Sequence, residues 1–131
     1  MSEKNLLKIL ENLLVACDDI EYGFANISNK NEVSGGEILG TFQEKEGLTI
    51  IATTGYLKDT GISFEGPFAK LTIEVNTSLN LVGLTAILSK KLAEKNISAN
   101  FVAAYFHDHV FVQYASRNKA IEILSSLKQS S

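Results

Sequence analysis

The stretch that decides the fold is PFAKLTIEVNTSLNLVGLTAILSKKLAEKN, residues 67–96. Apolar side chains occupy alternate positions in its first part, at Ala69, Leu71, Ile73 and Val75. This period of two predicts a half-buried strand. Four further apolar side chains recur at helical spacing, at Leu84, Ile87, Leu88 and Leu92. They predict an amphipathic helix that runs to about Lys95, with Ser78 as its N-cap.

The residues after this stretch continue the same unit. A second strand is predicted from about Ser98 to Phe106 and, after a tight turn, a third from Val110 to Tyr114. A final helix begins near Ser116, and its buried face is expected to consist of Ala120, Ile121, Leu124 and Leu127. The order β-α-β-β-α favours an α+β fold, an antiparallel sheet with both helices packed on one face.

The residues before the stretch are less regular. A helix is predicted over residues 3–15, because Ser2 can cap it and four leucines and isoleucines follow at helical spacing: Leu6, Ile9, Leu10 and Leu13. A strand is expected at 21–28 and a loop at 29–36. A hairpin is expected across 38–54, with its turn at Glu44-Lys45-Glu46-Gly47, where Glu44 and Glu46 are solvated.

Gly66-Pro67 contains the only proline and divides the chain into two predicted parts, 1–66 and 67–131. The first part carries 11 acidic and 5 basic side chains, the second 4 and 7, which gives net charges of −6 and +3. Opposite charges suit mutual docking of the two parts. A chance distribution explains them equally simply, because exposed charges contribute little stability.

Composition excludes several classes of protein. The chain has 131 residues, 45% hydrophobic, and a formal net charge of −3. These values are typical of a soluble globular chain, and the acidity argues against broad binding of nucleic acid or anionic membranes. No apolar run approaches the roughly 18 residues of a membrane span. Cys17, the single cysteine, excludes an internal disulfide and fits a reducing compartment, so a cytoplasmic location is expected.

Three segments together resemble a known family: TSLNLVGLT at 77–85, ANFVAAYFHDHVFV at 99–112 and FQEKEGLT at 42–49. With the predicted element order, they resemble an ACT domain, and in particular a small two-part bacterial family in which a short N-terminal ACT-associated domain precedes the ACT unit. The resemblance covers about residues 20–128. It implies a ferredoxin-like fold, non-catalytic binding of a small ligand, usually an amino acid, and assembly as a homodimer.

The chain departs from the usual ACT pattern in two ways. Only Gly83 remains of the Pro-Gly pair at the strand-to-helix corner, and no acidic residue precedes it. The chain also ends just after the last helix, so the second part lacks the fourth strand of a complete ACT sheet. We expect a strand from the first part to cover that edge, because an open edge invites aggregation. The two parts would then form one interlocked unit or a pair of ACT-like lobes.

The corner is the candidate ligand site. The first N–H groups of a helix have no helical partners and can hold a carboxylate without a basic side chain. From the residues alone, Ser78 can equally be an ordinary N-cap and Gly83 a close-packing residue. The resemblance implies a pocket made of the corner and the neighbouring strand: Ser78, Leu79, Asn80, Val82, Gly83, Leu84, Thr85, Asn100, Val102 and His107.

The segment His107-Asp108-His109 is a second candidate site. In a strand the two imidazoles would point the same way and could reach one metal ion, but two ligands make an incomplete site. A turn or a ligand contact is the favoured interpretation. The sequence contains no nucleophile elbow, phosphate loop or dinucleotide fingerprint. We therefore predict a ligand-binding regulatory protein without catalytic activity, metal or cofactor. The alternatives are a metal protein or enzyme built on this segment, or a ligand-free dimerisation module.

Overall fold

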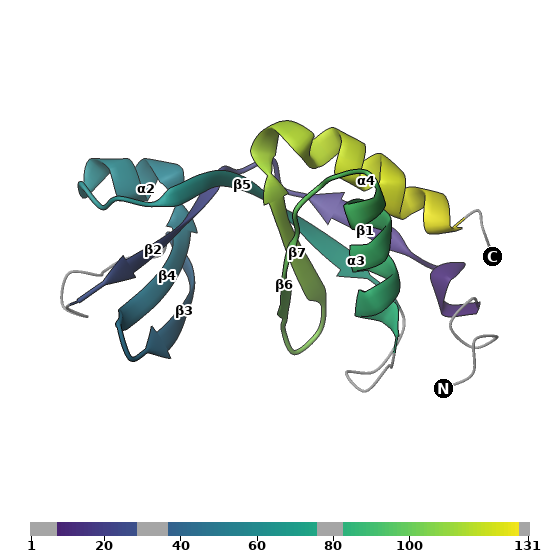
Figure 1. Ribbon diagram of the computed structural model, residues 1–131, viewed down its shortest axis with the longest axis horizontal. Helices are drawn as coiled ribbons and strands as arrows, with labels where there is room; N and C mark the ends of the chain where they lie inside the picture. The colour runs from purple at the N-terminus through teal and green to yellow at the C-terminus, as the bar shows by residue number, and fades with distance from the viewer. Residues whose placement is uncertain (1–7, 29–36, 76–82, 129–131) are drawn as a thin grey trace. The chain divides into compact units, whose positions relative to one another are not determined.

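The computed structural model describes residues 8–28, 37–75 and 83–128 (Figure 1). The elements in chain order are β1 (Leu14–Cys17), β2 (Tyr22–Ile27), β3 (Ile38–Glu44), β4 (Gly47–Thr53), α2 (Thr54–Asp59), β5 (Glu65–Glu74), α3 (Leu84–Glu94), β6 (Asn100–Ala103), β7 (Asp108–Gln113) and α4 (Arg117–Ser125), with short 3-10 turns on either side of α4. No helix in these ranges is long and apolar enough to cross a membrane. Two compact units result: residues 1–18 with 69–131, and residues 19–68.

The unit of residues 1–18 and 69–131 (unit 1) contains a sheet in the order β1-β5-β7-β6. Helices α3 and α4 cover one face of it, and their buried side chains share a core with alternate residues of β5 and β7. This core includes Leu71, Ile73, Leu88, Val110, Val112 and Leu124. The predicted order β-α-β-β-α, the α+β class and the buried faces of both helices are therefore confirmed.

The fourth strand of this sheet comes from the N-terminal part of the chain, as predicted. β1 pairs antiparallel with β5, with Leu14 opposite Glu74 and Cys17 opposite Leu71. The predicted helix over residues 3–15 is wrong in its second half, because the helix in the described residues ends at residue 10. Leu10 and Leu13 are buried at the helix end and the following turn, and the long-range pairing with β5 then imposes an extended backbone.

The unit of residues 19–68 (unit 2) repeats the antiparallel pattern. Its strands are ordered β3-β4-β2, and β2 also pairs with the beginning of β5, where Phe24 lies opposite Glu65. The predicted strand at 21–28 and the hairpin at 38–54 are confirmed; the loop predicted at 29–36 lies outside the described residues. Gly47 has a φ of 143°, and a Cβ there would lie 2.6 Å from the carbonyl oxygen of Ile27, so the turn requires glycine.

Three local features differ from the sequence predictions. Helix α2 was not anticipated; Thr53 caps it by accepting a hydrogen bond from the N–H of Tyr56 at 3.2 Å. Helix α3 begins at Leu84, with Gly83 as its N-cap, and Ser78 lies outside the described residues. Gly66-Pro67 lies inside β5. The division into domains 1–66 and 67–131 stays a prediction. The two compact units are defined differently, by which residues are close in space.

Two neighbouring leucines test how the N-terminal segment packs against the rest of unit 1. Leu13 is 2% exposed and lies in the core, whereas Leu14 is 56% exposed. We expect Leu13→Ala to lower the free energy of unfolding by about 2–5 kcal/mol. Leu14→Ala should change it by about 0.5 kcal/mol or less. Chemical denaturation of both variants measures the difference, and equal effects would contradict the observed position of β1.

Candidate functional site

The predicted ligand residues at the corner lie partly outside the described chain. Ser78, Leu79, Asn80 and Val82 belong to the range 76–82, which the structure does not describe. Of the others, Leu84 is 3% exposed and belongs to the core, and Thr85 is exposed. Gly83, the N-cap of α3, adopts a φ of 97° and has no side chain that could cap the helix.

Strand direction determines which predicted residues come together. β6 is antiparallel to β7, which follows it through a short turn, and α3 starts at the end of unit 1 where β5 finishes (Figure 1). The β6–β7 turn lies at that same end. It is closed by a hydrogen bond from the N–H of Ala104 to the carbonyl oxygen of His107, 3.0 Å long. His107 thus shares one end of unit 1 with Gly83 and Thr85, whereas Asn100 begins β6 at the other end, with Val102 between.

The segment His107-Asp108-His109 is split between a turn and a strand. His107 closes the turn, and its Nδ1 atom is buried without a hydrogen-bond partner. His109 lies in β7 opposite Val102, with its Nδ1 3.0 Å from Oγ1 of Thr72. Across the described ranges, no three His, Cys, Asp or Glu side chains are grouped so that they could hold a metal ion. The metal alternative gains no support from this arrangement.

The aromatic residues before this segment correct a sequence expectation. Alternation along the strand predicted from Ser98 to Phe106 would place Tyr105 and Phe106 on opposite faces, one towards the core and one towards the surface. Both are exposed, by 78% and 79%, and their rings form an edge-to-face pair with centroids 4.9 Å apart. They occupy the tip of the turn between β6 and β7, where the alternation of a strand no longer applies.

The face of unit 1 opposite its helices carries a polar group that the sequence did not reveal. Thr72 of β5 bonds to His109 of β7, and the Lys70 ammonium lies 3.3 Å from the Asp18 carboxylate. Burial lowers the pKa of His109, and the positive charges of Lys70 and His107 lower it further, against the opposing effect of Asp108. These effects favour the neutral form of the His109 imidazole. Predicting from the sequence that these four polar side chains lie on one face would require the register of β1, β5 and β7.

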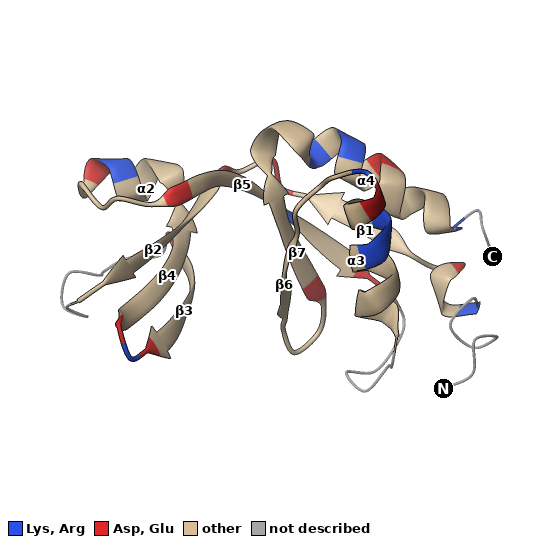
Figure 2. Ribbon diagram, in the orientation of Figure 1, with Lys and Arg blue, Asp and Glu red and all other residues tan. Residues whose placement is uncertain are grey.

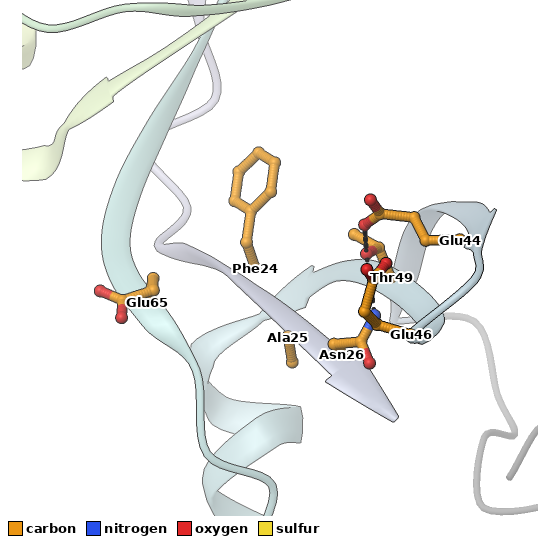
Figure 3. Close-up of a pocket in the computed structure, with 7 residues that line it drawn as sticks. All are labelled: Phe24, Ala25, Asn26, Glu44, Glu46, Thr49 and Glu65. Carbon is orange, nitrogen blue, oxygen red and sulfur yellow. Dashed lines mark hydrogen bonds between the residues drawn. The ribbon is translucent and has the colours of Figure 1, made fainter. Parts of the chain in front are cut away.

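Unit 2 has a hollow on the sheet face opposite α2 (Figure 3). Its volume is about 620 Å³. Phe24, Asn26 and Thr49 form its floor, and Glu44, Glu46 and Glu65 surround them. The amide Nδ2 of Asn26 donates to Oγ1 of Thr49 at 3.2 Å, and that hydroxyl donates to Glu44. The turn carboxylates are exposed, as predicted, and they also face this hollow.

The lowered pKa of His109 predicts how stability depends on pH. The unfolded chain takes up the proton near pH 6.5, and the folded protein only at lower pH. The contribution of His109 is therefore fully present above about pH 7.5 and is lost as the pH falls through about 6.5 towards the folded pKa. Denaturation between pH 7.5 and 5.5 should show this decrease in the wild type. The decrease should be reduced in His109→Gln and retained in His107→Gln; retention in both variants would contradict the assignment.

Sequence profiles of the ACT domain match the chain twice, over residues 1–69 and 63–126. No curated protein sequence matches it significantly. A crystal structure of a protein of unknown function from Vibrio cholerae, described as a possible transport protein, is 32% identical, with 95% of this chain and 97% of that chain covered and a TM-score of 0.88.

Two aspartate kinase structures share the fold at lower identity. The α and β subunits of an aspartokinase are 16% identical, with 86% of this chain and 95% of that chain covered and a TM-score of 0.68. The ligand-free regulatory subunit of aspartate kinase from Thermus thermophilus is 11% identical, with the same coverages and a TM-score of 0.59. Because the two profile matches together span residues 1–126, the chain belongs to the ACT-domain family.

Proposed function

We propose that this protein is a non-catalytic regulatory module that binds an amino acid at the beginning of α3. The observation that carries the proposal is the N-terminus of α3, where the N-cap Gly83 has no capping side chain and the first turn has no acidic residue, at the end of unit 1 that also holds His107. The ligand carboxylate would accept hydrogen bonds from the first-turn N–H groups.

The chemistry of this end suits an anion. The first-turn N–H groups lie at the positive end of the helix dipole, and Gly83 presents no Cβ that would crowd a ligand. Leu84 anchors the turn in the core, while Thr85 faces solvent. The Nδ1 atom of His107, buried without a hydrogen-bond partner, is a further polar atom at this end of unit 1. Residues 76–82, which complete the predicted site, are outside the described ranges.

The comparisons support a regulatory role. The aspartate kinase structures that share this fold include a regulatory subunit, and ACT domains commonly bind small regulatory ligands. At such low identity these structures support a shared fold and do not identify the ligand. We infer the ligand class from the chemistry at the N-terminus of α3, which suits a carboxylate. A regulatory module of this kind changes a partner by favouring one state of the assembly when its ligand is bound.

Thr85→Glu tests the site without weakening the helix. A carboxylate in the first turn stabilises a helix through its dipole, by about 0.3–1 kcal/mol, but repels a bound carboxylate. Asn118→Glu is the matched control, because Asn118 is an exposed position in the first turn of α4. We expect one or a few of the 20 common amino acids to raise the melting temperature of the wild type and of Asn118→Glu. Calorimetry should show affinity at least about tenfold lower for Thr85→Glu.

Two results would contradict the proposal. One is that no common amino acid stabilises the wild type; a ligand-free dimerisation module would then be the better description. The other is equal ligand affinity in Thr85→Glu and the wild type, which would move the ligand away from α3.

A homodimer through β6 is the assembly that we propose. β6 ends the described order of strands, and residues 98–106, SANFVAAYF, contain no charged residue and no proline. Edge strands are normally protected by charges, proline or bulges. β3, at the other end of that order, has an irregular register between Ile38 and Gly40 and ends at Glu44. The unprotected β6 is therefore suited to antiparallel pairing with a second β6 about a two-fold axis.

Charge at β6 tests the dimer. Val102 is 38% exposed, so Val102→Lys should leave the fold intact while two like charges oppose each other across the paired strands. Light scattering is expected to give a dimer mass for the wild type and a monomer mass for Val102→Lys. Gln43→Lys, an exposed change on β3, should stay dimeric. A dimer that survives Val102→Lys would exclude the β6 interface.

A further inference from the structure

Within the described residues of unit 2, the one helix, α2, packs on one face of the sheet. Alternate residues of β2 and β4 point into a core beneath α2: Ala25, Ile27, Ile50 and Ala52, with Tyr56 and Leu57 of the helix. The intervening residues therefore point to the opposite face. Cross-strand register aligns them in two rows, Phe42-Thr49-Asn26 and Gly40-Ile51-Phe24, with Glu65 beside Phe24. We call this the open face of unit 2.

The open face is apolar in its middle, and its described side chains are largely accessible. Phe42 is 72% exposed, and Phe24 and Ile51 are half-buried. A Cβ built on Gly40 would meet no atom within 4 Å, so space lies above that row. An exposed aromatic side chain beside a hollow of about 620 Å³ is typical of a surface that takes a partner.

The charge around this apolar surface has one predominant sign. Glu44 and Glu46 lie on one side of the hollow and Glu65 on the other, with the Phe24 ring between them (Figure 3). No basic side chain is among the residues that line the hollow. Lys45 lies between Glu44 and Glu46 in the turn that joins β3 and β4, where the ribbon is blue between two red segments (Figure 2). Residues 19–68 as a whole carry eight acidic and three basic side chains, a net charge of −5.

We infer that the open face of unit 2 is a docking surface for a basic segment of a partner protein. The partner chemistry follows from the two properties of the surface. Arg and Lys side chains lay their aliphatic stems on apolar surface and extend their charged groups to carboxylates, and Arg also stacks on aromatic rings. A segment in which Arg or Lys alternates with apolar residues therefore fits both the Phe42–Ile51–Phe24 surface and its glutamates. This inference concerns a different unit from the proposed amino-acid site and does not depend on it.

Two glycines provide a matched pair of variants. Gly40 lies on the open face and Gly55 on α2, and an added Cβ has no atom within 4 Å at either position. Neither glycine has a positive φ, so Lys is tolerated at both. Gly40→Lys places a cation in the surface that should bind a basic segment, and Gly55→Lys adds the same charge to unit 2 elsewhere. Circular dichroism and denaturation should show that both variants fold.

The probe is a fluorescent nine-residue peptide of alternating Arg and Leu, measured by fluorescence anisotropy with the full-length protein at 0.05 and 0.15 M salt. We expect saturable binding that weakens with salt. Gly40→Lys and Phe42→Ser should each weaken it at least about tenfold, and Gly55→Lys by less than about threefold. Peptides with Gln in place of Arg, or Ser in place of Leu, should bind at least about tenfold more weakly.

Several results would overturn the inference. Equal weakening by Gly40→Lys and Gly55→Lys would indicate a diffuse charge effect. Competition by free arginine or spermidine at the concentration of the peptide would assign the hollow to a small cation. A monomer mass for Phe42→Ser beside a dimeric wild type would assign the face to a second copy of the chain. Thr85→Glu should bind the peptide normally, so failure of the amino-acid site and failure of the docking surface remain distinguishable.

Discussion

The antiparallel pairing of β1 with β5 is the constraint on which the rest of the structure depends. β5 is the longest strand, and its last residues, Leu71 to Glu74, have their outer edge covered only because residues 14–17 return to that edge. Because β1 belongs to unit 1, the residues of unit 2 are inserted in the sequence between β1 and the rest of unit 1. Unit 1 therefore draws its strands from both sides of unit 2 in the sequence.

Local periodicity was enough to predict most of unit 1. The alternation around Leu71 and Ile73 and the helical spacing of Leu84, Leu88 and Leu92 belong to segments whose pattern repeats several times, and each was confirmed. The helix predicted over residues 3–15 was wrong in its second half, because Leu10 and Leu13 satisfy helical spacing up to the point where β5 provides a partner edge; residues 3–7 lie outside the described residues. Helix α2 is six residues long, too short for its pattern to repeat.

The candidate site shows a similar limit. Sequence alone could single out Gly83, from its place before an apolar helix, and His107, from its place near a turn. Their presence at one end of unit 1 depends on the directions of β5, β6 and β7, which is a property of the whole sheet. Predicting the hydrogen bond between Thr72 and His109 would also require the register between β5 and β7. Asn100 was predicted to line the ligand pocket because it belongs to the neighbouring strand. That strand, β6, is present, but Asn100 lies at its beginning, away from the β6–β7 turn.

The two proposed sites belong to different units, and β5 is the element that both units share: Glu65 borders the hollow, and Glu74 ends the strand before the segment that leads to α3. A regulatory module needs such a division, because one site must recognise the signal and another must pass it to a partner. Any coupling between them is reciprocal by thermodynamic linkage. A basic segment bound at unit 2 would then change amino-acid affinity at α3 by the same factor by which the amino acid changes the affinity for that segment.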